Sequence, residues 1–265
     1  MTFQPVIPTG GIVGWRFLQR TYDAQIQSFS SSAVNERETS YFLENIGNVR
    51  SAEDLVSDRR LLQVALGAFG LEGDLNNRFF IQKILSDGTQ ADDALANRLA
   101  DSRYREFANA FGLGPGDVPK TSSVSAMEKI ANDNLTARFE ISVGEADESM
   151  RIALFTQHAL QELAAQDGSE NRKWFDLMGL PPLRSMMETA LGLPRAFAQL
   201  DLDKQLEVFK DRLQRATGSS DLAQFTDNEA VEKLTDTYLA RSQIAQIQSV
   251  TSTAQTALIL LGGGF

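Results

Sequence analysis

The stretch Leu61-Leu62-Gln63-Val64-Ala65-Leu66-Gly67-Ala68-Phe69-Gly70-Leu71 spaces apolar side chains by three and four residues and then ends in glycine followed by leucine. This spacing predicts an amphipathic helix. Glycine readily takes the left-handed conformation at a helix end, and the next apolar residue then folds back onto the last turn. The same ending recurs at Phe111-Gly112-Leu113, Met178-Gly179-Leu180 and Leu191-Gly192-Leu193. The chain is therefore predicted to be all-α, built from many short packed helices.

Helical patterns continue on both sides of this stretch. Ser51 with Asp54 resembles a capping box, so the helix of the quoted stretch is expected to open near Ser51 or near Asp58, and Asp74 is expected to cap the next helix. Pro181-Pro182 is expected to open another helix. An apolar stripe predicts a first helix and consists of Trp15, Leu18, Tyr22, Ile26 and Phe29.

Glycine, proline and serine are concentrated in residues 112–123, between two periodic regions. Such a segment is typical of a boundary, so we expect two helical lobes, at residues 1–118 and 119–265. The pattern Leu61-Leu62-x-x-Ala65-Leu66-Gly67 returns as Met186-Met187-x-x-Ala190-Leu191-Gly192. Two related halves, or reuse of one common helix ending, would each explain this repeat.

The composition argues against several classes of partner. The chain carries 25 Lys and Arg against 35 Asp and Glu, a net charge of -10, so its field repels nucleic acid and anionic membrane surfaces. The strongly apolar run 257–261 is much shorter than the roughly 20 residues that span a bilayer. The start of the chain lacks a secretory signal pattern, so we expect a cytoplasmic protein, or one exported without a cleaved signal.

No motif predicts a catalytic, metal or cofactor site. Cysteine is absent, and the single histidine, His158, has no nucleophile-elbow motif to act on. The pair Asp201 and Asp203 lacks the glycine and distal glutamate of a calcium loop. Gly10-Gly11-x-x-Gly14 lacks the Lys-Ser/Thr of a phosphate-binding loop. We therefore expect no enzyme and no cofactor; an enzyme would need polar residues converging near 112–123 and His158.

The end of the chain has no charged residue from Ser242 to Phe265. Glutamine, serine and threonine alternate there with apolar residues at helical spacing, and the stripe begins upstream at Val231. Such a helix from Asn228 to Leu261 would be on the order of 50 Å long, at about 1.5 Å per residue. A compact lobe of this size cannot cover that length, so something else is expected to lie against it.

Two partners for this terminal helix are open. One is the N-terminal helix, packed antiparallel to it as part of the protein's own fold. The other is a second copy or another protein, because an uncharged helix can be buried without leaving ionic groups unpaired. The candidate interaction surface consists of Trp15, Tyr22, Ile244, Ile247, Val250, Leu258 and Leu261.

Several segments together resemble a known family. They are Phe42–Ile46, Asn48–Leu62, Ala65–Leu71, Ala94–Asp101, Arg151–Phe155, Thr189–Pro194 and Leu200–Gln205. In these segments the chain resembles the bacterial domain-of-unknown-function family 1217, and it departs from the family pattern around residues 166–182. The resemblance transfers no catalytic or binding residue.

The resemblance implies a bacterial protein whose relatives tend to be encoded among flagellar genes. Flagellar axial proteins likewise lack cysteine and have uncharged terminal helices that pair on assembly. We therefore expect a structural or assembly-associated protein of the flagellum, with flagellar components or itself as partner. The alternative is a cytoplasmic binding module or export chaperone for flagellar components.

Overall fold

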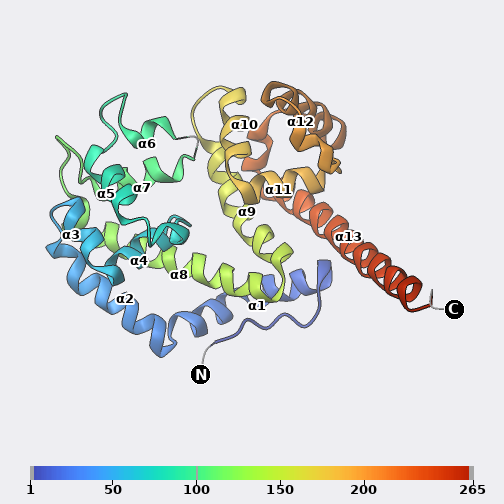
Figure 1. Cartoon of the computed structure of the whole chain (residues 1–265), viewed down its shortest axis with the longest axis horizontal. Helices are drawn as coiled ribbons and strands as arrows, with labels where there is room; N and C mark the ends of the chain where they lie inside the picture. The colour runs from blue at the N-terminus through green and yellow to red at the C-terminus, as the bar shows by residue number, and fades with distance from the viewer. Residues whose placement is uncertain (1–2, 100, 263–265) are drawn as a thin grey trace. The chain divides into compact units, whose positions relative to one another are not determined.

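The computed structural model of the chain describes residues 3–99 and 101–262, without the side chains of residue 195 and of residues 249–262. Every regular element within these residues is helical, and they form thirteen α-helices and five short 3₁₀ turns (Figure 1). This confirms the predicted all-α class. The chain divides by packing into two compact units. Unit 1 comprises the described residues within 1–6 and 21–143, and unit 2 those within 7–20 and 144–265.

Unit 1 is a bundle of short helices joined by tight turns. Its elements are the part of α1 (Gly11–Ser30) from Thr21 onward, α2 (Ala33–Asn45), η1 (Ile46–Asn48), α3 (Ala52–Ser57), α4 (Arg59–Gly67), η2 (Glu72–Asp74), α5 (Arg78–Asp87), α6 (Leu95–Arg98), α7 (Arg103–Phe111), η3 (Lys120–Ser122) and α8 (Val124–Ala146) as far as Val143.

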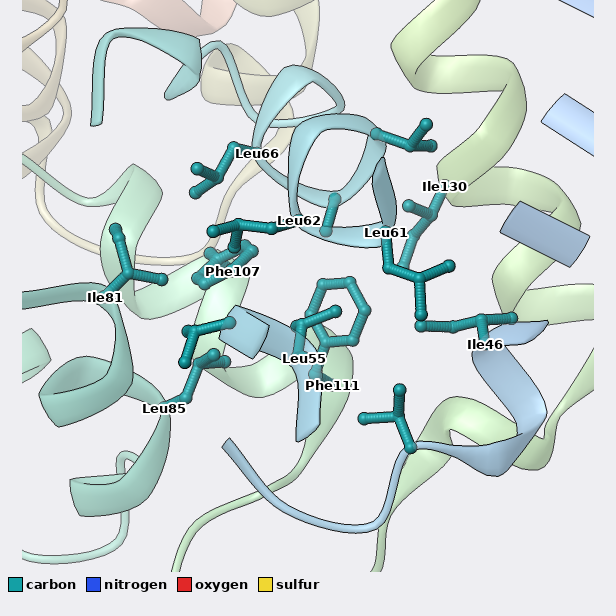
Figure 2. Close-up of a cluster of buried hydrophobic side chains, with 14 of the residues drawn as sticks. Ile46, Leu55, Leu61, Leu62, Leu66, Ile81, Leu85, Phe107, Phe111 and Ile130 are labelled. Carbon is teal, nitrogen blue, oxygen red and sulfur yellow. The ribbon is translucent and has the colours of Figure 1, made fainter. Parts of the chain in front are cut away.

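The core of unit 1 forms where the apolar stripes of these helices meet (Figure 2). Leu62 and Leu66 of α4 are fully buried with Phe107 and Phe111 of α7. Leu55 of α3 completes this group and is also fully buried. Burying such a side chain contributes about 1.5–3 kcal/mol. The quoted stretch 61–71 therefore lies at the centre of the unit's core.

Unit 2 combines longer helices with the beginning of α1. Its other elements are the end of α8, α9 (Glu148–Ala165), α10 (Glu170–Gly179), α11 (Pro181–Ala190), η4 (Arg195–Gln199), α12 (Leu202–Thr217), η5 (Leu222–Thr226) and α13 (Asn228–Gly262). Helices α9, α11 and α13 pack on one another. Trp174 of α10 stacks on Phe209 of α12 with ring centroids 5.5 Å apart.

Carboxylate and hydroxyl caps start several helices as predicted. Ser51 and Asp54 form a reciprocal capping box on α3, and Asp58 accepts two backbone N–H bonds at the start of α4. The prediction at Asp74 is wrong. Asp74 ends η2, and α5 begins only at Arg78, because a 3₁₀ turn intervenes and Asp74 instead accepts a hydrogen bond from the Asn77 side chain at 2.6 Å.

Three of the four predicted glycine endings are left-handed, with φ of 64° at Gly70, 60° at Gly112 and 65° at Gly192. The Leu71 N–H donates to the Leu66 carbonyl at 2.9 Å, which closes the last turn of α4. Gly179 differs, because it is the last helical residue of α10 and Pro181 starts α11 almost at once.

The repeated pattern does not give its glycines one role. Gly67 is the last residue of α4, and a side chain there would overlap Asn134 of α8. The glycine whose left-handed backbone matches that of Gly192 is Gly70, three residues after Gly67. Glycine is needed at position 67 because α4 and α8 pack closely there. It is needed at position 192 because the backbone there is left-handed.

The two units do not divide at the expected residue 118. The chain passes the glycine-rich loop and returns to the same core, where Thr121 donates to the Val49 carbonyl at 2.7 Å and Met127 of α8 is buried. Helix α8 runs unbroken past the division between Val143 and Gly144. A Gly/Pro-rich loop marks a break between helices, and it does not show whether the next helix leaves the core.

Replacing Gly112 by alanine is expected to lower the free energy of unfolding by about 1–2 kcal/mol, the cost of a left-handed L-residue. The added Cβ would also lie 2.8 Å from the Val118 carbonyl oxygen. Urea unfolding followed by circular dichroism measures the change. Gly47→Ala is the matched control, since nothing lies within 4 Å of its Cβ position. Equal stability of the two variants would contradict the role given to Gly112.

Candidate interaction surface

The first part of α13 belongs to the core of unit 2. Val231, Leu234, Tyr238 and Leu239 are buried, and the helix packs on α9, α11 and η5. These positions follow the apolar stripe that the sequence predicts. This part of α13 is therefore already covered by the protein's own helices.

Helix α1 meets α13 in antiparallel order within unit 2. The Arg16 guanidinium Nη2 lies 2.6 Å from Asp236 Oδ2, and a side chain at Gly11 would overlap Gln243. Moving back along α1 thus leads forward along α13. The expected antiparallel contact between the terminal helices is present, and it reaches as far as Gln243.

Beyond this contact the character of α13 changes. Ile244 is 55% exposed and Ile247 is 60% exposed, and they lie three residues apart on one helix. These isoleucines are exposed because α1 begins only at Gly11. The described residues before Gly11, which include Pro5 and Pro8, form no helix that would extend the contact between α1 and α13. Figure 1 shows this part of α13 extending away from α9–α12.

The seven residues of the predicted surface fall into three groups. Trp15 is fully buried and Tyr22 is half-buried, so they pack inside the units rather than on an open surface. Ile244 and Ile247 are exposed. The side chains of Val250, Leu258 and Leu261 lie outside the described residues.

Trp15 and Ile244 both lie on apolar stripes with helical spacing. One is buried and the other exposed because of the helices that pack beside each of them, which the spacing does not show. Phe79 shows the same limit, because in the sequence it stands in one helical run of apolar residues with Phe80 and Ile84. It is 89% exposed, since α5 starts at Arg78 and turns Ile81, Ile84 and Leu85 toward the core. The spacing of apolar residues does not reveal that this aromatic side chain is exposed.

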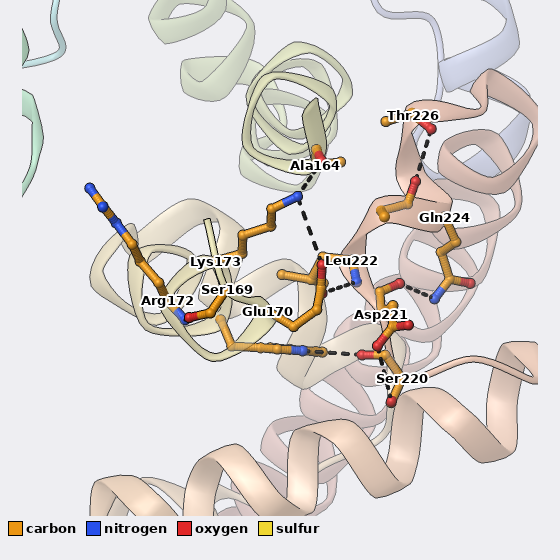
Figure 3. Close-up of polar contacts among 12 residues, drawn as sticks. Ala164, Ser169, Glu170, Arg172, Lys173, Ser220, Asp221, Leu222, Gln224 and Thr226 are labelled. Atoms are coloured by element: carbon orange, nitrogen blue, oxygen red, sulfur yellow. Dashed lines mark hydrogen bonds and ion pairs between the residues drawn. The ribbon is translucent and has the colours of Figure 1, made fainter. Parts of the chain in front are cut away.

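A buried polar cluster in unit 2 joins the end of α9 to α10 and η5 (Figure 3). Lys173 is only 7% exposed; its Nζ donates to the Ala164 carbonyl at 2.8 Å and lies 3.8 Å from Glu170 Oε1. Glu170 Oε2 accepts the Leu222 N–H at 2.9 Å. Because these charges are satisfied by neighbouring backbone and by each other, the cluster holds three elements together and offers no reactive amine.

A surface hollow of about 660 Å³ lies beside α3. Its lining includes Asn45, Asn48, Glu53, Asp54, Asp58 and Arg59. Hydrogen bonds from the Arg50 backbone N–H and the Ser51 side chain hold the pKa of Asp54 below its ordinary value. Asp54 and Asp58 already act as helix caps, so these two carboxylates of the hollow have structural roles.

No metal site is evident in the described part of the chain, where no three His, Asp or Glu side chains are placed to hold an ion. His158 lies exposed on α9, with its ring 5.5 Å from that of Phe155. Among helices within the described residues, none combines the length and apolarity needed to cross a bilayer.

Comparison with known proteins gives a family and a fold. The family model "Protein of unknown function (DUF1217)" matches residues 68–231. No curated protein matches the chain. The crystal structure of protein AGR_C_984 from Agrobacterium tumefaciens is similar, with a TM-score of 0.74 and 23% identity, over 91% of this chain and 99% of that one. At this identity the likeness shows the fold alone.

Alkaline pH is expected to destabilise the chain between about pH 10 and 12. Burial raises the pKa of Tyr238 to about 12, and Glu148 and Asp147 act in the same direction. An unfolded tyrosine ionises near pH 10. The folded state therefore keeps a proton that the unfolded state loses, so this stabilisation is complete below pH 10 and is lost as the pH rises to 12.

The measurement is urea unfolding of the wild type and of Tyr238→Phe at pH 9, 10 and 11. The variant is expected to lose less stability per pH unit above 10, and its absorbance titration at 295 nm should lack one late-ionising tyrosine. Identical pH slopes would show that Tyr238 does not keep its proton in the fold.

Proposed function

The chain belongs to the DUF1217 family of proteins of unknown function, and we propose that it is a non-enzymatic structural or assembly-associated protein of the bacterial flagellum. It acts by helix-mediated contacts with other proteins, and the second part of α13 is the contact surface. The observation that carries this proposal is the exposure of Ile244 and Ile247 inside a stretch without charged residues.

The chemistry of this stretch favours burial against a protein. Exposed isoleucines three residues apart on a helix form the start of an apolar stripe of the kind that packs on another helix. The flanking Gln243, Gln246 and Gln248 are neutral. Packing such a surface removes apolar area from water without desolvating an unpaired charge, which would cost several kcal/mol.

The internal contact between α1 and α13 supports the same assignment. It accounts for α13 as far as Gln243, and the exposed isoleucines begin at the next residue. The proposal therefore places the partner on the segment from Ile244 onward. Flagellar components or a second copy of this chain are the proposed partners, with no role for nucleic acid or for membrane insertion.

The flagellar setting rests on the family resemblance and on the cysteine-free, charge-free character of the chain's end. In this proposal the protein is made in the cytoplasm and then joins the flagellum. An export chaperone of the same fold would use the same surface and remain in the cytosol.

Replacing both Ile244 and Ile247 by serine is expected to abolish the contact while leaving the thermal melt of the isolated protein within about 2 °C, because exposed substitutions change stability little. Tagged wild-type protein is expected in the sheared flagellar fraction of motile cells. The double variant should be found in the cytosol instead, and cells that carry it should swim less.

Val118→Ser is the matched control, because Val118 is 80% exposed but lies in unit 1. It should fractionate like the wild type. Unchanged fractionation and motility of the isoleucine variant would remove the proposed surface. The chaperone alternative would be favoured if the wild-type protein stayed in the cytosol and bound a partner that the isoleucine variant no longer bound.

A further inference from the structure

The described residues before α1 form an extended segment that alternates in burial. Phe3, Pro5 and Ile7 are half-buried, whereas Gln4, Val6 and Pro8 are exposed. A period of two is the pattern of an extended chain lying on a surface. Residues 3–6 of this segment pack in unit 1 and are named the N-terminal strap below.

The strap is anchored by an aromatic side chain. The Phe3 ring lies 5.7 Å from Phe29, edge to face, and 6.2 Å from Phe139. Phe139 of α8 is fully buried and also meets Tyr22 edge to face at 5.4 Å. Rings at these separations attract one another beyond the effect of their buried area. The rings of Phe29 and Phe139 thus form the aromatic pocket that holds Phe3, and Tyr22 supports this pocket by packing on Phe139.

A second anchor holds the strap's backbone. Gln25 of α1 is only 8% exposed; its Oε1 accepts the Val6 N–H at 2.8 Å, and its Nε2 donates to the Val6 carbonyl at 3.2 Å. Nε2 also donates to Thr21 Oγ1 at 2.7 Å, which fixes the orientation of the amide. One side chain therefore satisfies both backbone groups of Val6, as a neighbouring strand would.

These two anchors define what the site recognises. The aromatic pocket selects a ring, and Gln25 selects an extended backbone three residues later without reading its side chain, because the Val6 side chain is 57% exposed. The ligand class is an extended peptide with an aromatic residue three positions before the residue that pairs with Gln25. Tyr22 and Phe29 belong to the apolar stripe predicted for the first helix, whereas neither Phe3 nor Gln25 was singled out by helical periodicity.

The connection from the strap to α1 consists only of residues 7–10, and glycines lie at its end and in the first turn of α1. Gly11 has a φ of 68°, and a side chain at Gly14 would overlap the Thr9 carbonyl. A turn built on such glycines can change direction without steric cost from a Cβ. Exchange of a terminal segment between identical chains needs a change in such a connection only.

We propose that the aromatic pocket with Gln25 is a docking site for the N-terminal strap of a second copy of this chain. The strap already fits the pocket of its own chain, and a second copy presents the identical segment, so the same contacts form between chains. Within one chain the strap has a high effective concentration, on the order of millimolar for a short connection, and it keeps the site filled until copies are concentrated by assembly. This site is independent of α13.

Peptide binding to full-length chains tests the pocket. A fluorescent peptide of residues 1–10 is titrated into the Phe3→Ala chain, whose own anchor is removed, and into the wild type. The Phe3→Ala chain is expected to bind at least tenfold tighter than the wild type. A peptide carrying Phe3→Ala should bind at least tenfold weaker, and so should the wild-type peptide on a chain with both Phe3→Ala and Gln25→Ala. A Val13→Ala chain, changed at a 72% exposed site of α1, should behave like the wild type.

Capture between chains tests the second copy. Tagged Phe3→Ala chain is expected to retain untagged wild type on a column at least fivefold better than it retains untagged Phe3→Ala chain. Equal retention of the two would place self-association elsewhere, as on α13, and would overturn the strap exchange while leaving the proposed function standing. Absence of peptide binding by a natively helical Phe3→Ala chain would overturn the docking site.

Hydrogen exchange of the intact wild type decides the case if Phe3→Ala does not fold. Excess unlabelled peptide of residues 1–10 should displace the strap and speed exchange of the Val6 amide, which Gln25 otherwise protects. An unchanged Val6 exchange rate at millimolar peptide would overturn the proposal.

Discussion

Helices of nine residues, such as α4 and α7, are too short to persist alone in water, where about 12–15 residues are needed even for favourable sequences. Two interactions make them stable here: burial of an apolar stripe, and closure of both helix ends. Asp58 closes the start of α4, and left-handed glycines follow the ends of α4 and α7 at Gly70 and Gly112. Because these ends are closed locally, the short helices pack into one core with fewer backbone groups left unpaired.

Features that depend on a few neighbouring residues were predictable from the sequence. The caps at Ser51, Asp58 and Asp147 and most glycine endings need only local chemistry. Gly179 was not predictable in the same way, because the helix that follows it decides its conformation. The division at Val143 was hidden for a similar reason: α8 carries apolar residues along its whole length, and only packing shows which of them enter unit 1.

The candidate surfaces divide along the same line. Periodicity placed Trp15 and Ile244 on apolar stripes, yet Trp15 is completely covered and Ile244 is more than half exposed. Their exposure differs because of the residue at which α1 begins beside α13, and this is a property of the tertiary structure. The strap escaped notice because its pattern has a period of two over a few residues, and Pro5 and Pro8 resemble a simple proline motif. The alternation Phe3, Pro5, Ile7 was the signal that was available.

The division of α1 between two packing units bears on synthesis at the ribosome. Residues 7–20 belong to a unit whose other members begin at Gly144, and Arg16 must wait for Asp236 to be made. At about 5–20 residues per second, that delay is roughly 10–40 s. The Trp15 face of the nascent chain has no mate in unit 2 until residues from Gly144 onward are made, and by then every part of unit 1 has been synthesised. Translation speed and nascent-chain helpers therefore bear chiefly on residues 7–20, which wait for partners encoded more than a hundred residues later.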